Sequence, residues 1–166
     1  MGYFAPLYHT TSIRNAAKIL VSDRLNVSSE YGNVSLSRNR YEKYGHIQLI
    51  LNQQALRYNY SITPFMAEAE RSTYSDSSEE VIGQDIVNIR RYILAIDITS
   101  DRCLRLLMGR LEGATKEQIL RDDLSSNLTP LRGTWLLYNE IMSSRIVINP
   151  RLNLLFTRLN QKLAQQ

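Results

Sequence analysis

Polar and apolar positions follow two different patterns along this chain. Over the first hundred residues, apolar residues are contiguous or repeat every second position, which predicts β-strands. These predicted strands cover residues 3–8, 34–37, 47–51 and 92–98, with weaker signals over 58–63 and from Val81. Val34 and Leu36 alternate with Ser35 and Ser37, so this strand should have one apolar face and one hydroxyl face.

Apolar residues spaced three and four apart predict helices elsewhere. Ser12 can cap a helix whose apolar face begins at Ile13, and Thr115 opens a capping box with Gln118. Further helical spacing surrounds Trp135 over 134–142, and a stripe of leucines repeats at positions 152, 155, 159 and 163. A short strand over 145–148 should end before Pro150. The sequence therefore predicts an α+β fold in one domain, 1–166, with mostly strands to residue 98 and mostly helices afterwards.

Composition narrows the classes of protein. A chain of 166 residues can bury about two thirds of its unfolded surface. The lone Cys103 excludes an internal disulfide, and with only His9 and His46 a zinc site of cysteines and histidines is not expected. No apolar run is long enough for a membrane span and no secretory signal is recognisable, so we expect a cytoplasmic protein with no membrane association and no metal.

The positive charge is placed unevenly along the chain. Residues 101–166 contain ten Lys and Arg but six Asp and Glu, and they account for the whole net charge of +4. A basic surface on this last third would favour an acidic partner or nucleic acid. The alternative is an ordinary solvated surface, because the basic residues stand singly and never form a run.

Three short stretches carry candidate chemistry. Tyr8-His9-Thr10-Thr11 closes the first apolar run, and the histidine should stand at the C-terminal end of the first strand. Ser35-Leu36-Ser37-Arg38 forms the hydroxyl-bearing strand, and Glu79-Glu80 precedes the apolar Val81-Ile82. The sequence has no Gly-rich phosphate loop, no HExxH motif and no nucleophile elbow.

In this order, the three stretches resemble the His-Ser-Glu signature of the ADP-ribosyltransferase superfamily. The likeness is to its diphtheria-toxin-like members, which include the poly(ADP-ribose) polymerases and the DarT-type toxins, and the segment 8–98 also resembles small proteins of bacteria and their phages. The resemblance implies a split antiparallel sheet with flanking helices, in which residues 1–98 hold the NAD site and residues 99–166 complete the fold. It also implies that NAD is the substrate.

The resemblance implies a role for each candidate side chain. One glutamate would stabilise the oxocarbenium-like transition state. Adjacent strand residues face opposite ways, so only one of Glu79 and Glu80 can point into the site. We prefer Glu80 because it directly precedes Val81, although Glu79 fits the spacing as well. His9 would bind the adenosine ribose, and the backbone of Thr10, where many relatives have glycine, would hold the nicotinamide amide. The remaining implied contacts are Ser35 or Ser37 to the glutamate, Arg38 to the pyrophosphate, and Tyr41 or Tyr44 stacking on nicotinamide.

These implied roles predict an NAD-dependent mono-ADP-ribosyltransferase that modifies a protein or nucleic acid. The resemblance to phage proteins extends this expectation to a phage-encoded enzyme that acts on components of the host. Two alternatives stay open. One is an NAD glycohydrolase, in which water is the acceptor. The other is a non-catalytic interaction or virion-associated protein that retains the fold with a lapsed NAD site.

Overall fold

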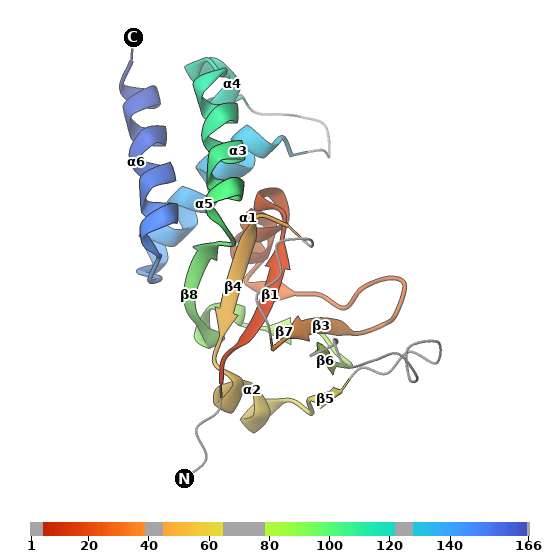
Figure 1. Cartoon of the computed structure of the whole chain (residues 1–166). Helices are drawn as coiled ribbons and strands as arrows, with labels where there is room; N and C mark the ends of the chain where they lie inside the picture. The colour runs from red at the N-terminus through yellow and green to blue at the C-terminus, as the bar shows by residue number, and fades with distance from the viewer. Residues whose placement is uncertain (1–4, 39–44, 65–78, 122–127, 166) are drawn as a thin grey trace.

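A six-stranded antiparallel sheet carries the first part of the chain (Figure 1). The computed structural model describes residues 5–38, 45–64, 79–121 and 128–165. The strand order is β5-β6-β3-β1-β4-β8, and a separate two-stranded sheet pairs β2 with β7. The strands are β1 Leu7–Thr11, β2 Arg24–Leu25, β3 Val34–Ser37, β4 Ile47–Leu51, β5 Thr63–Pro64, β6 Glu79–Ile82, β7 Ile86–Val87 and β8 Ile93–Ile98.

Helices cover one end of this sheet and one of its faces (Figure 1). They are α1 Ile13–Ser22, α2 Gln53–Asn59, the 3-10 helix η3 Ile89–Tyr92, α3 Asp101–Glu112, α4 Lys116–Leu120, α5 Pro130–Ser144 and α6 Pro150–Ala164. Helix α1 packs mainly against α5, whereas α6 packs against α3 and β8. The mixed architecture, with mostly strands up to residue 98 and α3 to α6 after it, confirms the predicted α+β class.

The strand boundaries correct the sequence prediction at two places. The first strand begins at Leu7 and runs to Thr11, so His9 lies in the middle of β1 and not at its C-terminal end. The predicted strand over 58–63 was wrong, because α2 continues to Asn59 and β5 contains only Thr63 and Pro64. The predicted strand over 145–148 is limited to a single parallel bridge between Ile148 and Ile96.

Helix α3 was not predicted from the sequence. Ser100 caps it by accepting a hydrogen bond from the Cys103 amide, and Cys103, Leu107 and Leu111 repeat every fourth residue on its buried face. Arginines and the exposed Leu106 interrupt the apolar stripe, which obscures its helical period. The helix is held by packing of this buried face against α6 and β8.

The leucine stripe of α6 is buried at three of its four positions, and Leu163 is partly buried. Leu152, Leu155 and Leu159 are fully inaccessible to solvent, and each such burial contributes about 1.5–3 kcal/mol. The basic residues beside the stripe are bound within the protein: Arg151 pairs with Asp101 at 2.7 Å and Arg158 pairs with Glu112. These exposed pairs add little stability, but they remove two cations from the surface available to a partner.

Close packing of α5 on α1 yields a test of the fold. A Cβ atom at Gly133 would lie 3.2 Å from the Arg14 Cα, so Gly133→Leu should lower the free energy of unfolding by roughly 1–3 kcal/mol. A Cβ atom built at Gly109 in α3 would have no neighbouring atom within 4 Å. Gly109→Leu should therefore raise the free energy of unfolding by about 0.5–1 kcal/mol, because leucine has the higher helix propensity. Urea unfolding of both variants measures the difference, and equal effects would contradict the packing of α1 on α5.

Candidate functional site

Strand β1 is paired very differently on its two sides. With β4 it is in register over five residue pairs, from Leu7–Leu51 to Thr11–Ile47. With β3 it shares a single pair, Tyr8–Ser37. The sheet therefore opens between β1 and β3 immediately beyond that pair, and we call this opening the β1–β3 seam.

His9 is the first residue of β1 in the seam. Its Nδ1 atom donates a hydrogen bond of 3.2 Å to the backbone carbonyl of Ser35, so a side chain bridges the strands where backbone pairing has stopped. Burial lowers the pKa of His9 below its ordinary value of 6.5 and outweighs the hydrogen bond to Ser35, which acts in the opposite direction. The neutral ring with Nδ1 protonated leaves Nε2 as an acceptor for a hydroxyl group.

Glu80 is a carboxylate placed among core residues. Only 1% of it is exposed, and it pairs across the strands with Leu36, which is equally buried. Its Oε1 atom forms an ion pair with Arg38, whose side chain reaches in from solvent and is 57% exposed. Its Oε2 atom is buried and has no hydrogen-bond partner among the residues that the structure describes. Glu80 therefore has one oxygen that is paired with Arg38 and one buried oxygen whose hydrogen-bonding capacity is unused within the described residues.

His9 and Glu80 lie on the same side of the sheet. Tyr8 pairs with Ser37, and successive residues of a strand face opposite ways, so His9 is on the same face as Leu36, which pairs with Glu80. Strand β3 lies between β1 and β6 in the sheet. A ligand that touches both His9 and Glu80 would therefore cross β3, where Leu36 is buried.

The two serines lie on the opposite side of β3 from Leu36. Ser35 pairs with Val81 and Ser37 pairs with Glu79, so the register brings neither serine to Glu80. The side chain of Glu79 lies outside the described part of the structure. A contact between a serine and a glutamate across this ladder would therefore involve Glu79.

Thr10 is held by a residue that the sequence analysis did not single out. The Gln48 Nε2 atom donates a hydrogen bond of 3.1 Å to the Thr10 Oγ1 atom. Gln48 is fully buried and pairs in register with Asp97, which is 3% exposed, so a polar row crosses β1, β4 and β8. The sequence signal for this row was a single polar residue in each of two apolar strands, Gln48 in β4 and Asp97 in β8. The remaining predicted contacts, Tyr41 and Tyr44, lie outside the described residues.

The described residues contain no group of three or more histidines, cysteines, aspartates or glutamates that is arranged to hold a metal ion. Within the same residues, no helix has the length and the apolar character needed to cross a membrane. No family model, no curated protein and no solved structure matches this chain.

The lowered pKa of His9 predicts a pH dependence of stability. As the pH falls below about 6.5, His9 becomes protonated in the unfolded chain but stays neutral in the folded protein. The free energy of unfolding should therefore decrease. The loss should begin near pH 6.5 and end at the lower native pKa. His9→Gln keeps a polar side chain but does not titrate, and it should lack this component.

Chemical unfolding of the wild type and His9→Gln between pH 8 and pH 5 measures the effect. Other titrating groups contribute equally to both proteins and cancel in the difference, provided that their sites are unchanged. Parallel curves for the two proteins across this range would show that His9 titrates normally in the folded state.

Proposed function

We propose that this protein is an NAD-dependent mono-ADP-ribosyltransferase that transfers ADP-ribose to a protein or nucleic acid acceptor. The observation that carries the proposal is the buried Glu80, whose Oε2 atom has no partner among the described residues and which is on the same face of the sheet as His9. A buried carboxylate with one unsatisfied oxygen is costly, by roughly 1–3 kcal/mol, and such groups concentrate at functional sites. The split antiparallel sheet expected from the sequence resemblance agrees with the single β1–β3 pair.

The proposed reaction breaks the bond between ribose C1′ and the nicotinamide nitrogen of NAD. The electron pair of that bond leaves with nicotinamide, and C1′ acquires the character of an oxocarbenium ion. The Glu80 carboxylate stabilises this positive charge and accepts a hydrogen bond from a ribose hydroxyl at Oε2. The acceptor's nucleophile then bonds to C1′ and releases its proton. His9, through Nε2, accepts from the adenosine ribose and fixes the cofactor.

Arg38 has two roles in this scheme: it pairs with Glu80, and it binds the pyrophosphate of NAD. In the structure, it forms the ion pair with Glu80. Paired with Glu80, it orients the carboxylate and compensates its burial. Its mostly exposed side chain also suits the pyrophosphate, for which its fork of donors is well shaped. Binding of the pyrophosphate would require Arg38 to exchange Glu80 for the cofactor or to bridge the two.

A non-catalytic interaction protein is the second candidate, and a specific observation favours it. Leu36 is buried between His9 and Glu80, and Arg38 already occupies one oxygen of the carboxylate. Both features suit a site that has lapsed into a structural ion pair. An NAD glycohydrolase shares the proposed chemistry with water as acceptor. The proposed transferase is encoded by a phage and acts in the cytoplasm of the host.

Glu80→Gln tests the proposed catalytic role. Removing the negative charge while keeping the shape should lower the turnover of NAD by roughly 10²–10³, because one electrostatic partner of the transition state is lost. NAD affinity should change less, since the charge interaction strengthens mainly in the transition state. Glu79→Gln is the matched control and should retain near wild-type turnover.

The assay uses purified protein with labelled NAD, alone and with whole-cell lysate. Label that is retained on lysate macromolecules and removed by either protease or nuclease identifies a transferase and the class of its acceptor. Release of free ADP-ribose without lysate identifies the glycohydrolase. No NAD consumption by the wild type under both conditions would favour the interaction protein, and loss of turnover in Glu79→Gln alone would move the catalytic role to Glu79.

A further inference from the structure

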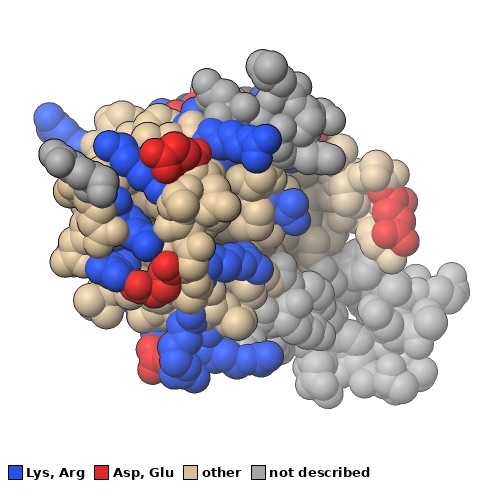
Figure 2. All heavy atoms as spheres, turned by 90° about the horizontal axis from the view of Figure 1, so that it is seen from above, with Lys and Arg blue, Asp and Glu red and all other residues tan. Residues whose placement is uncertain are grey.

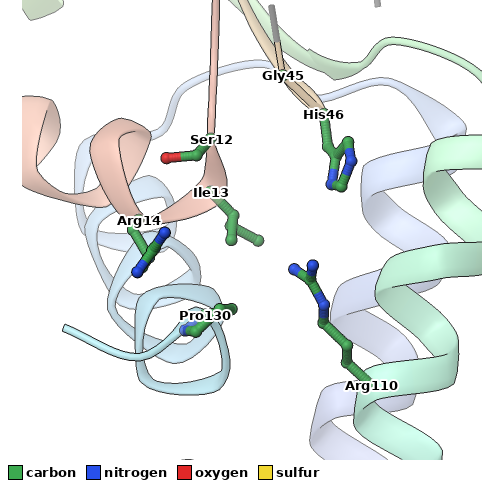
Figure 3. Close-up of a pocket in the computed structure, with 7 residues that line it drawn as sticks. All are labelled: Ser12, Ile13, Arg14, Gly45, His46, Arg110 and Pro130. Carbon is green, nitrogen blue, oxygen red and sulfur yellow. The ribbon is translucent and has the colours of Figure 1, made fainter. Parts of the chain in front are cut away.

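A half-open hollow of about 130 Å³ lies where β1 passes into α1 and β4 begins. It is separate from the seam, because neither His9 nor Glu80 lines it. Figure 3 shows Arg14, His46 and Arg110 around the open space, with the Arg110 guanidinium directed toward it. The lining residues come from α1, the start of β4, α3 and α5: Ser12, Ile13, Arg14, Gly45, His46, Arg110 and Pro130.

Among the described residues, the hollow has positive charge without a negative partner. No aspartate or glutamate is among its described lining residues. Arg14 and Arg110 are exposed, and within the described part of the chain neither side chain has a hydrogen bond or an ion pair. By contrast, Arg151 and Arg158 on α6 are both paired with carboxylates. Two cations that line one hollow make its local potential positive, which favours an anionic ligand.

The first turn of α1 lines the hollow through Ser12, Ile13 and Arg14. Ser12 satisfies the amides of Asn15 and Ala16 through its hydroxyl and its carbonyl. The amides of Ile13 and Arg14 have no acceptor within the helix. The positive end of α1 therefore favours a negative group in the hollow, in addition to the two guanidinium groups.

Gly45 permits the close approach of two backbone segments at one side of the hollow. Gly45 has φ of +148°, and a Cβ atom there would lie 2.2 Å from the carbonyl carbon of Thr11. Only glycine allows β4 to begin this close to the end of β1. The remaining surface includes Ile13 and Pro130, which present carbon and not competing charge.

We propose that this hollow binds a phosphate group that projects from a larger ligand. Pockets that enclose a whole cofactor usually measure about 300–1,000 Å³, so a space of about 130 Å³ suits the phosphate and leaves the rest of the ligand outside. Arginine forks match phosphate oxygens in geometry and in charge. A nucleotide and the backbone of a nucleic acid both supply such a group. The inference stands without the proposed role of His9 and Glu80.

The wider surface favours a ligand that continues beyond the hollow. Figure 2 looks onto the helical end of the molecule, where Lys and Arg cover more of the visible face than Asp and Glu. Lys18 on α1 and Arg105 on α3 are exposed cations on the helices that supply Arg14 and Arg110. Because neither Lys18 nor Arg105 lines the hollow, they provide controls that are matched in charge and in helix.

The test is a titration of the full chain with inorganic phosphate, AMP and a short single-stranded oligonucleotide without terminal phosphates, followed by NMR. We expect the largest shifts at the amides of Ile13 and Arg14. Arg14→Gln and Arg110→Gln should each weaken binding by about tenfold or more, as expected for a charged hydrogen bond. Lys18→Gln and Arg105→Gln should weaken it by less than about twofold for phosphate and AMP, because exposed charges outside the hollow are screened.

The three ligands distinguish the sources of the phosphate. Tighter binding of AMP than of phosphate identifies a nucleotide, and tighter binding of the oligonucleotide, with a steep loss in added salt, identifies a nucleic acid backbone. Thermal melting separates binding from folding, because each substitution removes an exposed cation and should not lower the melting temperature. The proposal is overturned if none of the three ligands binds at millimolar concentration, or if Arg14→Gln and Arg110→Gln bind as the wild type does.

Discussion

The single register pair between β1 and β3 is the constraint on which the candidate site depends. Strand β1 is fixed along its whole length by β4, so it cannot follow β3 as that strand turns away. The resulting gap is bridged by the His9 ring, which donates to the Ser35 carbonyl from a partly buried position. The same hydrogen bond selects the tautomer and leaves the opposite ring nitrogen as an acceptor. A discontinuity in the sheet thus prepares one side chain for a ligand.

The burial of Glu80 gives the seam its chemical character. A carboxylate at a core position of β6 is costly unless its charge is paired, and Arg38 supplies that charge from the protein surface. The pairing is incomplete, since only one oxygen is compensated by the described residues. The basic hollow has the opposite sign, because Arg14 and Arg110 line it and no carboxylate is among its described lining residues. At both places, the described residues leave a polar or charged group that a bound ligand would satisfy.

The sequence predicted most of the sheet because its strands bury apolar residues at every second position. It misplaced the first strand by several residues, since Tyr8-His9-Thr10-Thr11 lacks an apolar residue after Tyr8, yet β4 pairs with all four. It missed α3, whose stripe of Cys103, Leu107 and Leu111 is hidden among arginines. At the site, sequence order singled out His9 and Glu80 but not Leu36 between them, because cross-strand register follows from pairing that no local pattern encodes. The basic hollow was equally invisible, since Arg14 and Arg110 lie far apart in the chain.

We propose that the β1–β3 seam receives NAD between His9 and Glu80. The most direct measurement maps the backbone amides of the wild-type protein that respond to NAD in solution by NMR. The account predicts saturable shifts that are largest at residues 9–10, 35–38 and 80, with a concerted change in the signals of the His9 ring. Shifts confined to residues 12–14 and 45–46 would place the cofactor in the basic hollow, and they would contradict the claim, as would no response at millimolar NAD.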